Sequence, residues 1–309
     1  MRVGVSLALL AFVLRSIDLG LLWQRVSAMR PGWLLLAMVA FASTQAVGVW
    51  RWHRLLKAQH IDVERRRLAE SMWVSLFFNN FLPSNIGGDV IRITDTAPAA
   101  GSKTLATTVI MVDRVLGLVA LVIVASVGAL AASAIGLHVP GERWLWIACG
   151  GGVLAAVPVI AMPQLTGRLL APIRALDRPW VTERAQRLEE AALKFHADPW
   201  ALAGAFGGAL VVQVTIVGFY LLAAQGLSVP LPVFLGAVLI PVSLAVQMAP
   251  VSINGFGVRE AVFAFFFARF GLPTDGAVAL SLVATGLVMG LSLVGGVLFL
   301  TRRSPQPAQ

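Results

Sequence analysis

The sequence predicts an all-α integral membrane protein: a polytopic helical bundle of about six crossings plus two re-entrant helical hairpins, built as an inverted repeat. Three observations predict this fold. Of the 309 residues, 58% are hydrophobic and only 13% are charged, whereas soluble proteins carry about 25% charged residues. Apolar segments recur along the chain, and several approach the roughly 20 residues that a helix needs to cross a bilayer. Two shorter apolar segments border stretches rich in Pro, Gly and Asn.

The crossings are predicted from the longest apolar segments. The first, at 3–14, lies between Arg2 and Arg15 and has no small-x-small cleavage site, so it fits an uncleaved helix better than a signal peptide. The segment that follows, 15–32, contains three arginines on the predicted outer side, as an interfacial amphipathic stretch would. The remaining crossings are predicted at about 33–50, 104–136, 144–162, 200–224 and 277–300.

The two hairpins are predicted where short apolar segments meet helix breakers. Segment 71–82 runs into the break at 79–92, and the break at 249–260 separates 231–249 from 258–270. Proline removes a backbone donor, and glycine adopts conformations that other residues avoid. Irregular backbone at membrane depth persists only where protein or trapped water satisfies its polar groups. The two helices that flank each break are therefore predicted to form a hairpin, which enters the membrane, turns at the break, and leaves on the side where it entered.

The distribution of positive charge predicts the orientation. Connections 51–70 and 163–199 are rich in Lys and Arg, and so is the C-terminal tail, whereas 225–232 and 271–276 contain neither. Lys and Arg accumulate on the cytoplasmic side. Both termini are therefore predicted to be cytoplasmic, in a chain that spans the inner membrane several times.

The order of crossings and hairpins then repeats in the opposite sense. A first half at 1–136 and a second half at 143–303 are predicted within a single transmembrane domain, 1–309, with 163–199 as the cytoplasmic connection between them. Part of this connection, 180–196, has the pattern of an amphipathic helix on the membrane surface. Interrupted segments at corresponding places in two halves are the sequence pattern of a transporter's binding site.

Ionisable side chains gather at the two breaks. Such groups cost about 2.5–3.5 kcal/mol each at membrane depth, so each needs a partner or a function. Asp89 and Arg92 are three residues apart and share one face if that segment is helical. A guanidinium matches the oxygens of a phosphate, and glycine backbone N–H groups bind the same anion. The alternative is that these groups pair only with one another and with the broken helix ends.

The residues predicted to bind a lipid headgroup come from both breaks and from the crossing between them: Asn80, Pro83, Gly87, Gly88, Asp89, Arg92, Asp113, Arg114, Asn254, Gly255, Gly257, Arg259 and Glu260. For the Asn and Ser side chains at the breaks, including Asn79, helix capping is favoured over headgroup binding. Gln213 and Gln247, inside apolar segments, are expected to form interhelical hydrogen bonds.

Several classes of function are disfavoured. The single Cys149 excludes an intramolecular disulfide, and four scattered histidines have no zinc-ligand spacing. No phosphate-binding loop, dinucleotide fingerprint or nucleophile elbow is present, so neither a cofactor, a metal nor catalytic residues are predicted. The net charge of +9 follows from the positive-inside rule and does not indicate a nucleic-acid partner.

Four motifs together resemble a known family. They are Arg51-Trp52, the first break from Asn80 to Arg92, Asp113-Arg114-Val115-Leu116-Gly117-Leu118, and the second break, which ends in Gly-x-Gly-Val-Arg-Glu at 255–260. Over nearly its whole length the chain is similar to the lysylphosphatidylglycerol synthase transmembrane region, also called the flippase-like domain family. The resemblance implies a multi-pass protein with paired re-entrant helices. In the multiple-peptide-resistance-factor branch it implies a flippase module that moves aminoacylated phosphatidylglycerol between leaflets.

The chain departs from the family pattern in two places. Relatives often show Pro-Gly-x-x-Gly-Glu in the first break, where this chain has the sequence from Pro83 to Asp89, and Glu-Arg where it has Asp113-Arg114. The headgroup preference is therefore expected to differ. The chain ends at Gln309, so the soluble aminoacyl-transfer domain of the full synthase is expected to be absent.

Three functions remain open at this point. The first is a non-enzymatic translocase that moves a phosphate-bearing or aminoacylated headgroup, on a phospholipid or a polyprenyl phosphate, through a polar groove at the hairpin tips. The second is a membrane-embedded transferase using Asp89, Asp113 or Glu260 as a base, although no metal-binding pair or nucleophile–base set supports it. The third is an accessory subunit for a separate lipid-modifying enzyme. The spacing of Gly286 and Gly290 permits helix association within or between chains.

Overall fold

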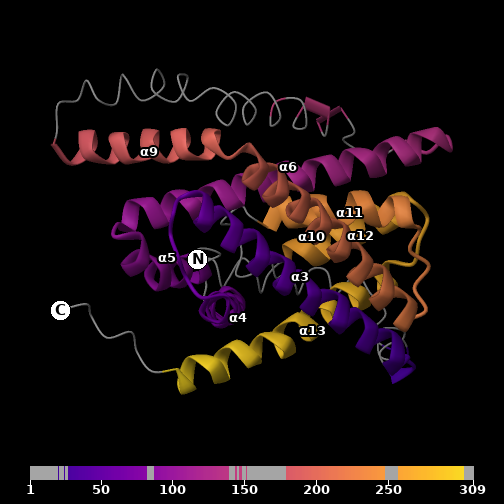
Figure 1. Cartoon of the computed structure of the whole chain (residues 1–309). Helices are drawn as coiled ribbons and strands as arrows, with labels where there is room; N and C mark the ends of the chain where they lie inside the picture. The colour runs from indigo at the N-terminus through magenta and orange to yellow at the C-terminus, as the bar shows by residue number, and fades with distance from the viewer. Residues whose placement is uncertain are drawn as a thin grey trace.

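The computed structural model describes residues 27–81, 87–138, 179–247 and 257–302, with a few isolated positions besides. All regular elements in these ranges are α-helices (Figure 1). They are α3 (Pro31–Ala58), α4 (Arg65–Phe81), α5 (Gly87–Ala100), α6 (Lys103–Ala134), α9 (Pro179–Ala197), α10 (Pro199–Gly226), α11 (Val233–Gln247), α12 (Val258–Arg269) and α13 (Thr274–Thr301). The all-α prediction is confirmed for these residues. The crossings predicted at 3–14 and 144–162 lie outside the described ranges.

Four of the described helices are long and apolar enough to cross a membrane: α3, α6, α10 and α13. They coincide with the crossings predicted at 33–50, 104–136, 200–224 and 277–300. The shortest have 28 residues, about 42 Å at 1.5 Å per residue, which exceeds the roughly 30 Å of bilayer hydrocarbon. Large apolar side chains on their surfaces, such as Leu35, Val214 and Leu300, are exposed and available to lipid. The chain is a multi-pass membrane protein.

The connection predicted at 51–70 is shorter in the structure. Helix α3 continues through Arg51 and Trp52 to Ala58, and α4 already begins at Arg65. The high density of Arg and Lys suggested a loop, but none of these residues disfavours a helix. This difference moves Arg51 from a predicted loop onto a membrane helix.

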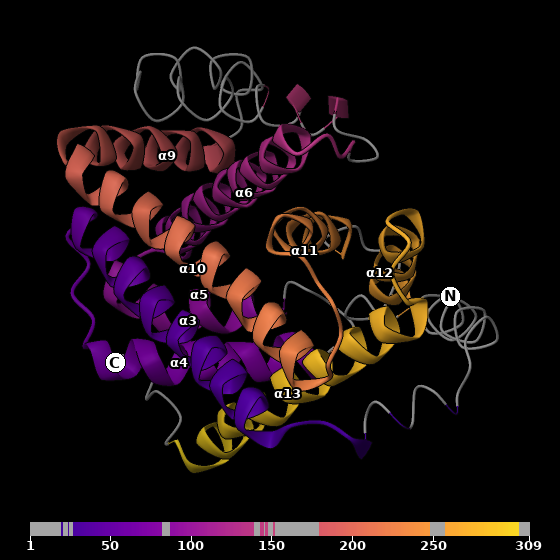
Figure 2. The ribbon, with the colours of Figure 1, turned by 90° about the vertical axis from the view of Figure 1, so that its right-hand side faces the viewer.

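Helices α3 and α10 pack against each other and run antiparallel (Figure 2). The N–H of Arg30, before α3, donates to the carbonyl of Gly226 at the end of α10 at 2.8 Å. At the other end, Nη2 of Arg54 donates to the carbonyl of Trp200 at 3.3 Å. Glycine on α10 lets the backbones approach, because a Cβ at Gly208 would press on the ring of Trp50.

These two helices also have matching ends. Each has 28 residues and begins with a proline in its first turn. Each is followed by a non-glycine residue in the left-handed region, His60 with φ 59° and Ser228 with φ 52°. Two segments far apart in the sequence therefore fold with the same length and the same termination.

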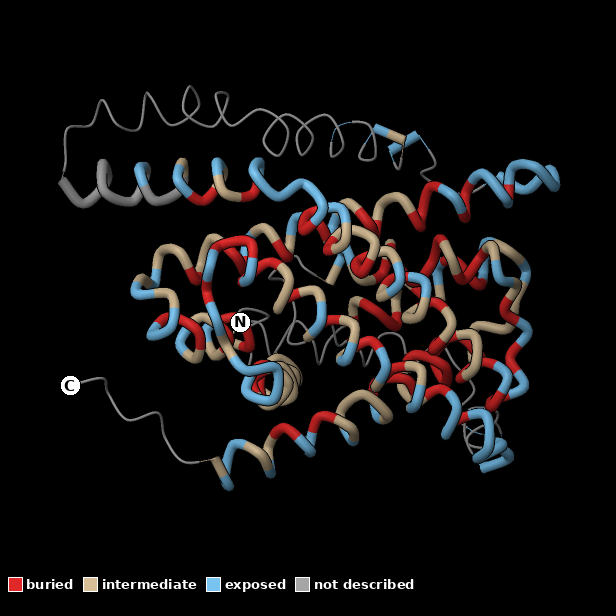
Figure 3. Tube along the Cα trace, viewed as in Figure 1, coloured by how far each residue is buried: buried red, intermediate tan, exposed pale blue. Residues whose placement is uncertain are grey.

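Several of the other contacts between helices also occur in matched pairs. Helix α4 packs on α13 as α11 packs on α6, and α5 packs on α6 as α12 packs on α13. Helix α3 contacts α4 as α10 contacts α11. The buried positions concentrate where these helices meet (Figure 3). Helix α9, which covers the predicted amphipathic stretch, lies at the edge of the bundle, where Nε2 of Gln59 donates to the carbonyl of Ala191 at 3.0 Å.

The two predicted breaks each fall between a pair of short helices in contact, α4 with α5 and α11 with α12. The breaks predicted at 79–92 and 249–260 are shorter than expected, because 79–81, 87–92 and 258–260 are helical, and 82–86 and 249–256 lie outside the described ranges. The N–H of Gly88 donates to Oδ1 of Asn79 at 2.8 Å, so Asn79 caps α5 as predicted. A Cβ at Gly88 would collide with the carbonyl of Ser75 and the amide of Asn79, and only glycine fits this contact. Re-entry of the two pairs into the membrane stays a prediction.

The contact between α13 and α4 supplies a test of the packing. A Cβ at Gly295 would overlap the backbone carbonyl of Trp73, whereas a Cβ at Gly290 on the same helix would meet nothing within 4 Å. We expect Gly295→Ala to lower the free energy of unfolding by about 1–3 kcal/mol, because the backbones must separate. Gly290→Ala should be neutral, or stabilising by up to about 1 kcal/mol through helix propensity. Denaturant titration in detergent measures both, and equal stabilities for the two variants would contradict this packing.

Candidate functional site: a buried arginine–aspartate network

The site is centred on Asp113 of α6, whose carboxylate binds two arginines from two other helices. Oδ1 accepts a hydrogen bond from Nε of Arg51 on α3 at 2.6 Å, and Oδ2 accepts one from Nη2 of Arg92 on α5 at 3.1 Å. Only 3% of the Asp113 side chain is exposed. One carboxylate therefore joins three helices inside the bundle, by charge-assisted bonds that are stronger than neutral ones.

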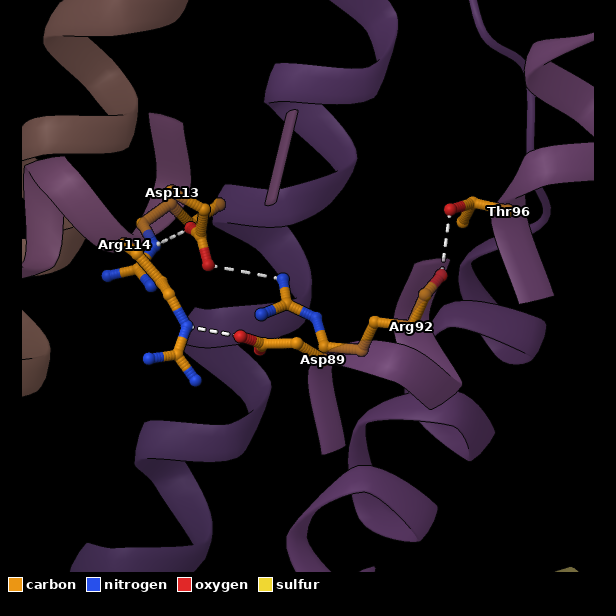
Figure 4. Close-up of polar contacts among 6 residues, drawn as sticks. Asp89, Arg92, Thr96, Asp113 and Arg114 are labelled. Atoms are coloured by element: carbon orange, nitrogen blue, oxygen red, sulfur yellow. Dashed lines mark hydrogen bonds and ion pairs between the residues drawn. The ribbon is translucent and has the colours of Figure 1, made fainter. Parts of the chain in front are cut away.

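A second ion pair lies beside the first. Nε of Arg114, the next residue on α6, contacts Oδ2 of Asp89 on α5 (Figure 4). Helices α5 and α6 are thus joined by two ion pairs of opposite direction, Arg92 with Asp113 and Asp89 with Arg114. Asp89 is buried, but 30% of the Arg114 side chain is exposed, so this pair forms the accessible side of the network.

Trp52 holds the Arg92 side chain from a third direction. The guanidinium carbon of Arg92 lies 4.2 Å from the centre of the Trp52 ring, in a cation–π contact. Both side chains are buried, and Trp52 is fully so. Nε of Arg92 and Nε1 of Trp52 have no hydrogen-bond partner among the described residues. The network therefore contains two buried donors that no acceptor in the described parts of the chain satisfies.

The charged residues of the second break have a different environment. Glu260 is fully buried, and its Oε2 accepts from the N–H of Gly257 at 2.6 Å while its Oε1 accepts from Oγ of Ser281 at 2.7 Å. Nε of Arg259 lies 3.6 Å from the same Oε1. Gly257 has φ 81°, a left-handed conformation that suits glycine. Glu260 thus caps α12 and joins it to α13.

The structure brings four of the predicted site residues into one network: Asp89, Arg92, Asp113 and Arg114. Gly87 and Gly88 begin α5 beside them, and the amide of Asn80 donates to the carbonyl of Leu76 at 2.9 Å. Arg259, Glu260 and Gly257 form the second group at the start of α12. Pro83, Asn254 and Gly255 lie outside the described residues. A lipid contact by any of these side chains stays a prediction.

Sequence reasoning missed Arg51 and Trp52 as site residues. Arg51 was predicted to belong to a basic connection, and its partner Asp113 lies 62 positions away in the chain. The one available signal was that Arg51-Trp52 belongs to the motifs that carry the family resemblance. The predicted interhelical role of Gln213 is confirmed, because its Nε2 donates to the carbonyl of Gly117 on α6 at 3.3 Å.

These observations define a polytopic helical membrane protein with an ionic network buried between its helices. The family described as the lysylphosphatidylglycerol synthase TM region matches residues 1–296. The chain belongs to this family, as its motifs predicted, and the family points to a function related to membrane lipids. No curated protein matches the chain.

The cost of breaking the network is testable with a matched pair of substitutions. Asp113→Asn removes the carboxylate that Arg51 and Arg92 share, so we expect it to lower the free energy of unfolding by about 3–5 kcal/mol. The control is Asp62→Asn, which removes an ion pair with Lys57 of similar length, 3.0 Å, whose carboxylate is 84% exposed. The control should cost at most about 1 kcal/mol. Thermal or denaturant unfolding measures both, and a loss of similar size in the two variants would contradict a buried network.

Proposed function

We propose that the protein is a membrane lipid translocase, which moves a phosphate-bearing headgroup between leaflets while the acyl chains stay in the bilayer. The observation that carries this proposal is the convergence of Arg51, Arg92 and Arg114 on one network inside an apolar bundle. A headgroup crosses lipid slowly because its charge loses water. Guanidinium groups replace that water, since their planar array of donors matches phosphate oxygens.

The proposal includes an inverted repeat. Its support is that α3 and α10 have equal lengths, matching ends and antiparallel directions, and that their neighbours pack in corresponding pairs. Two halves with the same order of helices, joined through antiparallel equivalents, have opposite orientations in the membrane. In this arrangement α4–α5 and α11–α12 are re-entrant pairs that open toward opposite leaflets, as in other transporters built from inverted repeats.

In this proposal the protein moves the lipid without a catalytic step. It lies in the inner membrane with both termini in the cytoplasm, an orientation that its distribution of Lys and Arg favours. A transferase would need a carboxylate that is available as a base. Both carboxylate oxygens of Asp113 are instead bound by Arg51 and Arg92, and Oδ2 of Asp89 lies against Arg114, so these oxygens are already engaged by guanidinium groups. The network is better suited to hold an anion than to abstract a proton.

Reconstitution tests the proposal directly. Purified protein is placed in liposomes that contain phosphatidylglycerol labelled on one acyl chain, and a membrane-impermeant quencher is added outside. We expect the label of the inner leaflet to become accessible much faster than in empty vesicles, because the headgroup crosses through the protein. Vesicles with folded protein that retain their inner-leaflet label as empty vesicles do would contradict the translocase function.

Arginine variants connect this movement to the network. Arg92→Gln should reduce the rate by at least about tenfold, a loss of about 1.4 kcal/mol in interaction with the headgroup. Arg259→Ala is expected to reduce the rate as well, because the second group is proposed to contact the same headgroup. The control is Arg54→Gln, which removes a guanidinium from α3 one turn beyond Arg51, where it contacts Trp50 and the carbonyl of Trp200. A normal rate in folded Arg92→Gln protein would remove the network from the transport route.

A further inference from the structure

Among the residues that the structure describes, the network contains one more positive charge than negative charge. Three guanidinium groups, of Arg51, Arg92 and Arg114, face two carboxylates, of Asp89 and Asp113. Most of these groups are buried, so water and salt compensate the remaining charge poorly. By contrast, Arg259 and Glu260 of the second group balance each other. The excess positive charge is therefore located between α3, α5 and α6.

Among the described residues, the network also contains buried donors without a hydrogen-bond partner, whereas the buried acceptor without a hydrogen bond, Oδ2 of Asp89, lies against Nε of Arg114. Nε of Arg92 and Nε1 of Trp52 are donors only, both are buried, and neither has an acceptor among the described residues. A phosphate oxygen is an acceptor that satisfies such donors. An ammonium group is itself only a donor and would leave both without a partner.

No buried carboxylate is left to receive an amine. The buried acidic residues in the described parts of the chain are Asp89, Asp113 and Glu260. The first two lie against arginines, and both oxygens of Glu260 accept hydrogen bonds from Gly257 and Ser281. A headgroup amine that entered this region would meet positive charge without a counter-ion, which costs free energy at low dielectric.

From the charge excess and the unused donors we infer that the network selects lipids by the net charge of the headgroup. It takes a headgroup with one net negative charge, such as phosphatidylglycerol, in preference to one whose amines cancel or reverse that charge, such as lysylphosphatidylglycerol. The phosphate lies against the guanidinium groups and supplies the missing acceptor. This inference rests on the proposed translocase function and narrows its substrate class.

The test compares two lipids in the reconstituted full chain. Liposomes contain either phosphatidylglycerol or lysylphosphatidylglycerol, each labelled on an acyl chain so that the headgroup is unchanged. We expect phosphatidylglycerol to move at least about tenfold faster. Equal rates, or faster movement of the lysyl lipid, would overturn the charge selectivity while leaving lipid movement intact. Movement of neither lipid would instead overturn the proposed function.

Two substitutions shift the net charge of the network in opposite directions. Arg51→Gln makes the network neutral and should reduce the preference for phosphatidylglycerol severalfold. Asp89→Asn removes a negative charge from the network and should keep or increase this preference. Arg54→Gln, outside the network, should leave the preference unchanged. A preference that is the same in Arg51→Gln and in the unaltered protein would overturn the inference.

Binding provides a readout that does not require transport. Short-chain phosphatidylglycerol should raise the melting temperature of the detergent-solubilised protein, because a ligand that binds only the folded state stabilises it. Short-chain lysylphosphatidylglycerol should raise the melting temperature less at the same concentration. In the Arg51→Gln variant, the two lipids should raise the melting temperature by more similar amounts. A larger stabilisation by the lysyl lipid would contradict selection by net negative charge.

Discussion

The interaction on which the structure depends most is that of one buried carboxylate, Asp113, with the guanidinium groups of Arg51 and Arg92. In water such pairs contribute little, because solvent competes for both partners. Inside an apolar bundle, each partner left alone is strongly destabilising. The position of Asp113 therefore determines how α3, α5 and α6 must pack. It also determines where positive charge is available to a ligand.

In the proposed inverted repeat, corresponding positions of α3 and α10 are used differently. Trp52 and Tyr220 occupy the same place in α3 and α10, helices of equal length that both begin with proline. In the first half the Trp52 ring holds Arg92. In the second half Tyr220 packs against Phe263, with ring centres 5.6 Å apart, in a hydrophobic cluster. Helices with similar packing thus differ in their polar contacts, and Glu260 caps α12 whereas Asp89 and Arg92 of α5 form ion pairs with α6.

Much of the fold could be predicted from the sequence because the bilayer imposes simple rules. A long apolar segment must be a helix, which located α6 and α13, and helical spacing placed Asp89 and Arg92 on one face. The Asn79 cap followed from local chemistry. Arg51 could not be assigned in this way, because basic residues near a helix end indicate a cytoplasmic loop unless a distant partner such as Asp113 is known. The contact that joins Glu260 to α13 likewise depends on Ser281, on another helix.

The coupling between Arg51 and Asp113 tests this account most directly. Arg51→Gln, Asp113→Asn and the double variant form a double-mutant cycle, with the free energy of unfolding in detergent as the measurement. If the two residues form a buried ion pair, the sum of the stability losses in the two single variants should exceed the loss in the double variant. The difference, which is the coupling energy, should be about 1–3 kcal/mol. Losses that add within about 0.5 kcal/mol would show that the two residues act independently. The network would then not be what holds these helices and their charge in place.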